Sequence, residues 1–188
     1  IESAPYLVAV LVTVPAGGLG FGCSCGPAPV ESGTTADGPA DLIQPVGVAV
    51  DGAGNVYVSG YDNRVVIYDN DGNFIDQFGG PGSGNGQFDG PLSIAVDKVG
   101  FIFVVDSNNN RVQKFNSSGT HLLTFGSAGA GAGQLSSPIG LADSPSGLVY
   151  VADTFNNRIM VFTPNGAFVA AWGYNVKAGG GTGFEICK

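Results

Sequence analysis

Two aspartates and two arginines recur at one spacing in the second half of the chain. Asp106 stands five residues before Arg111, and Asp153 stands five residues before Arg158, each pair enclosing an Asn-rich stretch. A carboxylate so placed can accept backbone N–H bonds and pair with an arginine, which would fix a loop. Because a catalytic group needs to occur only once, the repetition favours a structural role for these four residues and for the matching Arg64.

The other residues with catalytic or metal-binding potential have simpler interpretations. His121 is the only histidine and falls at the repeat position of Phe74 and Phe168, where we expect it to pack on an outer strand. The run 69–73, Asp-Asn-Asp-Gly-Asn, begins like a calcium loop, but its twelfth position is Gly80 instead of a carboxylate. It is interpreted as a hairpin turn. The sequence therefore predicts no catalytic residue, no cofactor and no metal site.

The three cysteines and one asparagine are candidates for covalent modification. Cys23 and Cys25 lie two residues apart, and an extended chain separates such Cα atoms by about 6.5–7 Å, at or beyond the disulfide limit. Cys187 belongs to a similar loop far along the chain, so we expect cross-links to a neighbouring chain or to residues after Lys188. Cysteines in a Gly-rich loop favour an oxidising, extracellular setting. Asn116 begins an N-glycosylation sequon in a predicted exposed turn.

Composition limits the partners of the chain. Its 188 residues carry 15 acidic and 7 basic side chains, a net charge of −8, and 32 are glycine. Phosphate backbones would repel such a surface, so we expect no nucleic-acid partner. The longest mostly apolar run, Tyr6–Val14, is shorter than the ~20 residues that cross a bilayer. We therefore expect no membrane span.

An internal repeat of 46 or 47 residues places the candidate residues. Pro45-Val46-Gly47-Val48-Ala49 returns at Pro91 and Pro138, and each copy closes on an aromatic residue and a glycine. Each copy holds four β-rich runs separated by turn residues, which predicts a four-stranded antiparallel meander. In the first copy the expected strands are 46–50, 55–59, 64–68 and 74–78. The small residues of the first run suit sheets that converge on an axis, as the blades of a propeller do.

The repeat resembles a known family. The residues that carry the resemblance are Val56-Tyr57-Val58, Ile102-Phe103-Val104 and Val149-Tyr150-Val151, followed by Asn63-Arg64-Val65, Asn110-Arg111-Val112 and Asn157-Arg158-Ile159. They strongly resemble the NHL repeat over roughly three quarters of the chain, and the cysteine-bearing loop resembles those of secreted bacterial NHL proteins. The resemblance implies an all-β, six-bladed type of propeller, used as a binding scaffold and in related families as a lyase or lactonase. Repeat one departs from it, with Gly60 in place of the aspartate.

The repeats divide the chain into four parts. Residues 1–40 are expected to hold one stray outer strand, Tyr6–Val12, and a Gly/Pro-rich loop, and repeats one to three occupy 41–90, 91–137 and 138–188. The Gly-rich tracts 79–86 and 126–133 are expected to be flexible connections between blades. Six repeats need about 280 residues, so three form a partial propeller with exposed blade faces. We expect either a segment of a longer protein or association between copies.

The hairpins between second and third strands, together with the blade connections, form the predicted binding face. It gathers aromatic, amide and acidic side chains, namely Tyr61, Asp62, Asn108, Asn109, Phe155, Asn156 and Tyr174. Aromatic and amide groups can stack on and hydrogen-bond a protein or a glycan. The sequence thus favours an extracellular, non-catalytic scaffold for association, adhesion or self-assembly, whose partners are other copies or missing blades. The alternative is a metal-dependent lactonase or lyase whose channel needs further blades.

Overall fold

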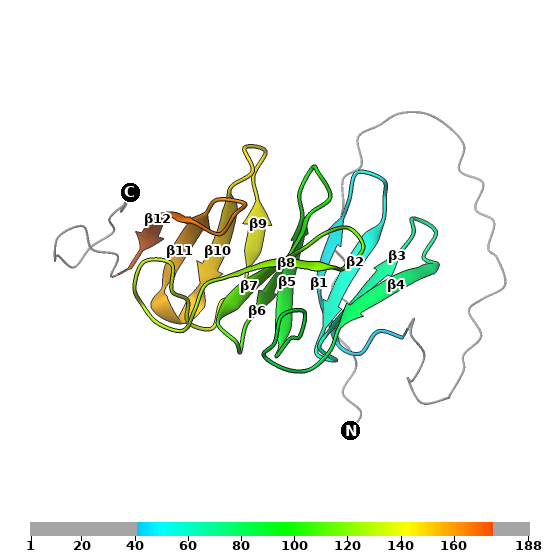
Figure 1. Ribbon diagram of the computed structural model, residues 1–188, viewed down its shortest axis with the longest axis horizontal. Helices are drawn as coiled ribbons and strands as arrows, with labels where there is room; N and C mark the ends of the chain where they lie inside the picture. The colour runs from blue at the N-terminus through cyan, green and yellow to red at the C-terminus, as the bar shows by residue number, and fades with distance from the viewer. Residues whose placement is uncertain (1–40, 175–188) are drawn as a thin grey trace, which may run out of the picture. The chain divides into compact units, whose positions relative to one another are not determined.

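Three four-stranded antiparallel sheets make up the part of the chain that the structure describes, residues 41–174 of a computed structural model (Figure 1). Within each sheet the strands follow one another in chain order. The first sheet holds β1 (Pro45–Val50), β2 (Val56–Gly60), β3 (Arg64–Tyr68) and β4 (Phe74–Gly79). The second holds β5 (Pro91–Val96), β6 (Ile102–Asp106), β7 (Arg111–Phe115) and β8 (His121–Phe125). The third holds β9 (Leu141–Asp143), β10 (Val149–Asp153), β11 (Arg158–Phe162) and β12 (Phe168–Gly173), with a short 3₁₀ helix η1 (Thr154–Asn156) after β10.

The same type of side-chain bond closes the tight hairpins. The Oδ1 atom of Asp51 accepts the N–H groups of Ala53 and Asn55 at 2.9 Å, and Asp97 does the same in the second sheet. Asp69 accepts two N–H groups in the β3–β4 turn, so the run 69–73 is a hairpin turn, as predicted. A residue that bonds its own backbone two and four positions on fixes the turn without help from the core.

Apolar side chains on both faces of the middle sheet join the three sheets. The first strands of successive sheets contact one another, β1 with β5 and β5 with β9, so the sheets converge along these strands. Toward the outer strands, the Phe78 ring of β4 packs 4.7 Å from that of Phe115 in β7. The Phe125 ring of β8 packs 4.9 Å from that of Phe162 in β11. The predicted all-β propeller blades are therefore confirmed.

Three strands of the first copy differ by one residue from their expected bounds. β1 begins at Pro45 and not at residue 46, β2 spans Val56–Gly60 and not 55–59, and β4 ends at Gly79 and not at residue 78. β9 has only three residues, because Ile139 and Gly140 exchange backbone bonds with Ala152 before regular pairing starts. Tyr6–Val12, Cys23, Cys25 and Cys187 lie outside the described residues, so their predicted roles stay predictions. Asn116 lies in the β7–β8 turn, where its Oδ1 accepts the N–H groups of Ser118 and Thr120. Within residues 41–174, no helix has the length and apolar character to cross a membrane.

Candidate functional site at the hairpin edge

The residues of the predicted binding face lie along one edge of the three sheets, called here the hairpin edge. It consists of the turns 60–63, 107–110 and 154–157 and the blade connections 79–90 and 126–137. The connections meet the turns directly: the Nδ2 atoms of Asn109 and Asn156 donate to the carbonyls of Gly82 and Gly129 at 3.0 and 2.9 Å. The second and third turns are therefore built into the connections that precede their own sheets.

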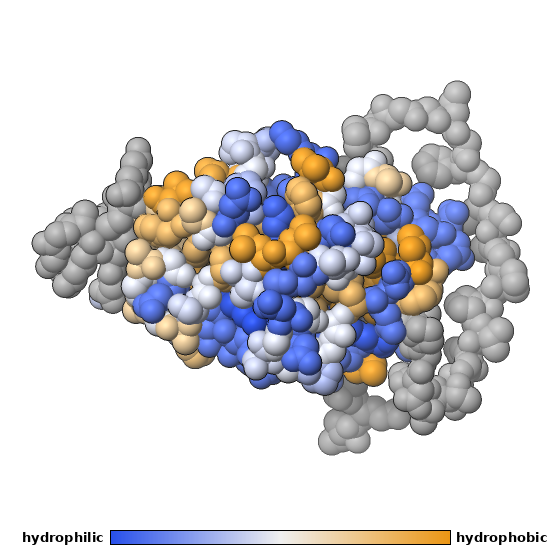
Figure 2. Space-filling view, in the orientation of Figure 1, coloured by the Kyte–Doolittle hydropathy of each residue, from blue (hydrophilic) through white to orange (hydrophobic). Residues whose placement is uncertain are grey.

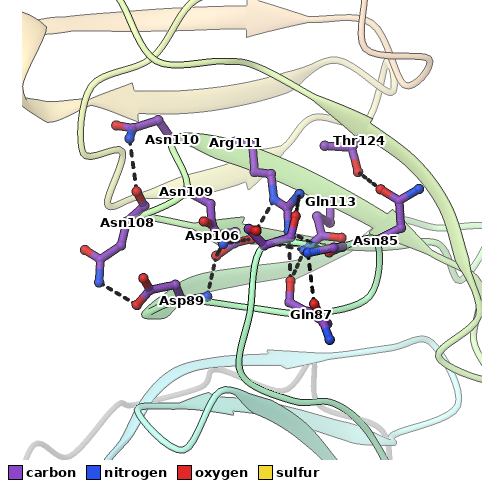
Figure 3. Close-up of polar contacts among 12 residues, drawn as sticks. Asn85, Gln87, Asp89, Asp106, Asn108, Asn109, Asn110, Arg111, Gln113 and Thr124 are labelled. Carbon is purple, nitrogen blue, oxygen red and sulfur yellow. Dashed lines mark hydrogen bonds and ion pairs between the residues drawn. The ribbon is translucent and has the colours of Figure 1, made fainter.

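Asp106 is the buried centre of this construction in the second sheet (Figure 3). Its Oδ1 atom accepts the N–H of Asp89, from the connection, at 2.8 Å and the Nδ2 of Asn109 at 3.0 Å. Its Oδ2 atom accepts the Nε of Arg111 at 2.7 Å and the Nε2 of Gln113 at 3.1 Å. A buried carboxylate needs such partners, and here all of them tie the β6–β7 hairpin to the connection.

The far end of Arg111 holds the connection itself. Its terminal nitrogens donate to the carbonyls of Ser83 and Gly84 at 2.8 Å and of Gln87 at 2.9 Å. The tract 79–86 is thus held at defined carbonyl oxygens, instead of the bare flexible linker expected from its composition. The arginine's five N–H donors in a rigid fork suit it to this convergence of a carboxylate and three carbonyls.

The third sheet repeats the aspartate–arginine arrangement, with Met160 at the repeat position of Gln113. Asp153 is buried and accepts the N–H of Ser136 at 2.6 Å and the Nε of Arg158 at 2.7 Å. The terminal nitrogens of Arg158 donate to the carbonyls of Ala130, Gly131 and Gln134 at 2.7–2.9 Å. These contacts agree with the structural role that repetition suggested.

In the first sheet, an aspartate at a different position pairs with the arginine. Gly60 occupies the strand position of Asp106, since it pairs with Pro45 as Asp106 pairs with Pro91. The turn that follows Gly60 is one residue shorter than its counterparts in the other two sheets. Asp62 in this turn supplies the carboxylate and pairs with the Nε of Arg64. Arg64 also donates to the carbonyl of Asp41, before the first strand. The arginine position is therefore used in all three sheets, whereas the acidic position is not.

Sequence reasoning missed the glutamines of the connections. Gln87 and Gln134 place their Oε1 atoms on the N–H groups of Gly84 and Gly131 at 3.0 and 2.8 Å. A Cβ on Gly82 would lie 2.4 Å from the Oε1 of Gln87, so only glycine leaves room for that side chain. The sequence did hold a signal in their spacing, because Gln87 stands three residues after Gly84 and Gln134 three residues after Gly131, at matching positions of the repeat.

Three aromatic side chains face solvent at the hairpin edge. Tyr61 is 56% exposed, Phe155 72% and Tyr174 58%. Tyr174 lies beside the third turn, where its N–H donates to the carbonyl of Asn157. Asn108 is also exposed, and its Nδ2 donates to Asp89 Oδ1 at 2.9 Å. All four polar residues of the predicted seven thus have partners within the edge, so the outward chemistry is aromatic.

Two hollows open at the opposite edge, between the turns of neighbouring sheets. The larger, of about 590 Å³, lies between the first and second sheets and includes Asp51, Tyr57 and Val99. The smaller, of about 340 Å³, lies between the second and third sheets beside Lys114. Burial opposes ionisation of Asp51, but hydrogen bonds from Asn55, Ala53 and Tyr57 outweigh it and hold the pKa below its usual value.

The described residues contain no cluster able to hold a metal. Within residues 41–174, no three or more His, Cys, Asp or Glu side chains gather as ligands would. His121 packs edge-on against the Phe115 ring, 5.7 Å between centroids, and its Nε2 lies 2.8 Å from Thr124 Oγ1. Burial and the charge of Arg111 hold its pKa below the usual value. On this outer strand it serves the packing role predicted for it.

Comparisons with known proteins agree with the repeat geometry. Residues 88–115 match the family model of the NHL repeat, and residues 33–61 match that of the beta-propeller repeat. No curated protein matches the chain.

Among solved structures the chain is similar to lyases that carry the same fold. Virginiamycin B lyase from Staphylococcus aureus, as an inactive H270A variant with quinupristin, aligns with a TM-score of 0.55 at 18% identity, over 71% of this chain and 42% of that one. A streptogramin B lyase aligns at 0.53 and 17% identity, over 69% and 47%. A selenomethionine form of the Staphylococcus enzyme aligns at 0.54 and 14%, over 79% and 56%.

At these identities the likeness concerns the fold alone. The chain spans about half the length of these structures, between 42% and 56% of each. The three repeated sheets of residues 41–174 are thus blades of the propeller type, and one of the repeats, at residues 88–115, matches the NHL repeat.

Proposed function

We propose that the chain is a non-catalytic β-propeller scaffold, outside the cell or at its surface, that mediates protein association or adhesion through the hairpin edge. The observation that carries the proposal is the exposure of Tyr61, Phe155 and Tyr174 on turns whose polar groups already bind one another. Exposed aromatic side chains on rigid supports bind with little loss of conformational freedom. Peptides and glycans both offer surfaces on which such rings stack.

The proposal also accounts for the buried Asp–Arg pairs. The side chains of Asp106 and Asp153 have no exposed area, and their carboxylates bind the arginines that hold the connections. A scaffold needs turns that keep their shape, and these pairs supply that. The extracellular setting rests on the cysteines, two of which stand in a Gly-rich loop.

Selection of ligands by the full chain tests the role of the hairpin edge. Peptides from a displayed random library and glycans on an array are selected on the immobilised chain, and their affinities are measured by calorimetry. We expect Tyr61→Ala and Phe155→Ala to weaken selected ligands at least tenfold, as removal of a buried aromatic contact does. Val99→Ala, an equally exposed apolar residue at the opposite edge, is the matched control.

Two results would contradict the proposal. One is that neither library yields a ligand. The other is that Val99→Ala weakens the ligands while the aromatic substitutions do not, which would move binding to the hollow between the first two sheets.

A second candidate is a metal-dependent lyase or lactonase whose channel is completed by further blades. The observation in its favour is that the three solved structures named above are lyases. The test is ring opening of quinupristin and of simple lactones by the full protein with added divalent cations. Turnover that disappears with a chelator would favour this candidate over the scaffold.

A further inference from the structure

The hollow between the second and third sheets, at the edge opposite the hairpin edge, contains a buried lysine. Its volume is about 340 Å³, and Phe101, Pro145 and Pro164 form apolar parts of its wall. Lys114 of β7 also lines it, although this residue is only 7% exposed. Lysines are almost never buried to this extent unless their charge is paired. The surroundings of this ammonium group therefore indicate whether the lysine serves the fold or a ligand.

The matching position is apolar in the other two sheets. Lys114 is the fourth of the five residues of β7, and Ile67 and Val161 are the fourth residues of β3 and β11. Ile67 is 4% exposed and Val161 2%. An aliphatic side chain therefore satisfies the fold at this position, and packing between sheets does not require a charge there.

Only part of the hydrogen-bonding capacity of Lys114 is used. Its Nζ atom donates to the carbonyl of Pro164 at 3.2 Å and lies 4.0 Å from the centre of the Phe101 ring. The face of an aromatic ring stabilises a cation, but an ammonium group carries three donors. Within residues 41–174, no carboxylate forms an ion pair with Lys114 and no second acceptor bonds its Nζ. This buried charge can therefore still accept an anionic partner.

A second lysine lines the same hollow. Lys98, in the β5–β6 turn, donates its Nζ to the carbonyl of Pro145 at 3.3 Å. At the tip of this turn, hydrophilic surface lies next to hydrophobic surface (Figure 2). The three arginines of residues 41–174 each pair with an aspartate, whereas the two lysines there, Lys98 and Lys114, do not. In a chain of net charge −8, both of these lysines thus gather at one hollow.

Two aspartates in the wall limit which anions can bind. The Oδ1 atom of Asp97 accepts the N–H groups of Val99 and Phe101 at 2.9 Å, so this carboxylate is held within its own turn. Asp143, the last residue of β9, also lines the hollow and forms no described ion pair with either lysine. Their negative charges oppose an anion. A ligand must therefore gain binding energy from the apolar wall as well as from the lysines.

We propose that the hollow beside Lys114 binds a small organic acid that carries a carboxylate on a flat apolar ring. The carboxylate accepts hydrogen bonds from the ammonium groups of Lys114 and Lys98, and such charge-assisted bonds are stronger than those between neutral groups. The ring packs on Phe101, Pro145 and Pro164, where it gains apolar contact area. A volume of about 340 Å³ is at the small end of ligand pockets, which favours a single ring.

An NMR titration of the isotope-labelled full chain with phenylacetate tests the proposal. We expect saturable shifts of the backbone amides in the turns 97–101, 144–148 and 163–167, because residues of all three turns line the hollow. Phenylacetamide has the same ring without the charge, and acetate has the charge without the ring. Each should bind about tenfold more weakly than phenylacetate, since a hydrogen bond to a charged group and burial of a ring each contribute at least that much.

Lys114→Ile removes the charge with little risk to the fold, because isoleucine stands at the matching position of the first sheet. We expect this variant to melt as one cooperative unit and to bind phenylacetate about tenfold more weakly than the wild type. Phe155→Ala is the control for stacking of the probe on an exposed ring, since Phe155 is 72% exposed at the hairpin edge. It should leave the affinity for phenylacetate unchanged.

Three results would overturn the inference. They are the absence of saturable binding of phenylacetate, equal affinities for phenylacetate and phenylacetamide, and unchanged affinity in a folded Lys114→Ile variant. If that variant does not fold, the comparison of the acid with its amide on the wild-type chain decides the question. The hollow lies apart from the hairpin edge, so each of these results leaves the proposed scaffold role to its own test.

Discussion

At the scale of single residues, Arg111 and Arg158 each hold four residues together. Each joins a buried aspartate to three carbonyls of a Gly-rich connection. We expect Arg111→Ala to lower the free energy of unfolding by about 3–5 kcal/mol, because it leaves the carboxylate of Asp106 buried without its cation. Urea unfolding followed by circular dichroism measures this.

The first sheet provides the matched control for that loss. The Arg64–Asp62 pair is more exposed, at 18% and 14%, than the Arg111–Asp106 pair at 12% and 0%. Arg64→Ala should therefore destabilise the protein less than Arg111→Ala. Arg111→Lys keeps the charge but lacks the fork and should recover only part of the loss. Equal losses for Arg64→Ala and Arg111→Ala would mean that burial of the aspartate is not the deciding factor.

The turn carboxylates predict how stability responds to acid. Hydrogen bonds hold the pKa of Asp51 below its usual 3.8 despite burial, and bonds led by the Asn73 side chain lower the pKa of Asp69. A lowered folded-state pKa contributes stability above pH 3.8, and this is lost as the pH falls through the folded value. Asp51→Asn should therefore flatten the fall in melting temperature below pH 4.

Asp71→Asn is the control for that prediction. It removes one negative charge from an exposed turn in the same sheet, and Asp71 takes part in that turn through its backbone N–H, which donates to Asp69 Oδ1. The acid limb of the Asp71→Asn profile should follow the wild type. A profile for Asp51→Asn that is as steep as the wild type would show that its turn bonds do not drive the acid response.

At the scale of the elements, each sheet has a glycine in the turn between its last two strands, and the effects of replacing these three glycines can be compared. Gly72, Gly119 and Gly166 all have φ between +73° and +83°, so alanine meets the same left-handed strain, about 1–2 kcal/mol, at each. At Gly119 and Gly166 the new Cβ also meets a phenylalanine ring, which adds about 1–3 kcal/mol of overpacking. Chemical unfolding of dilute protein should rank Gly119→Ala and Gly166→Ala well above Gly72→Ala. Three equal losses would mean that the contact with the phenylalanine ring adds nothing to the backbone strain.

The strands and turns could be predicted from the sequence because their causes are local. β-rich runs, turn residues and the repeat of 46 or 47 residues located β1 to β4 of the first copy within one residue, and the repeated spacing predicted the Asp106–Arg111 pair. The hydrogen bonds from Arg111 to the carbonyls of Ser83, Gly84 and Gln87 could not be predicted, because they depend on the path of the loop, which its composition does not determine. The role of Asp62 in the first sheet could not be predicted either, because it depends on the shape of a turn that is one residue shorter than the other two.

At the scale of the whole array, the three sheets differ in how many neighbours they have. β2, β6 and β10 are each the second strand of a sheet, so strand position is the same in all three. Every residue of β6 is buried, because the second sheet has a neighbour on each face, whereas the first and third each have a described neighbour on one. In arrays of this kind stability comes from each repeat and from its interfaces with adjacent repeats.

Hydrogen exchange should therefore be slowest in the middle of the array. In dilute protein, we expect the amides of Ile102–Asp106 to exchange at least tenfold more slowly than those of Val56–Gly60 and Val149–Asp153, because opening β6 breaks two sheet interfaces. Mass spectrometry of peptic fragments measures all three strands in one sample. Equal rates would mean that the sheets open together as one cooperative unit.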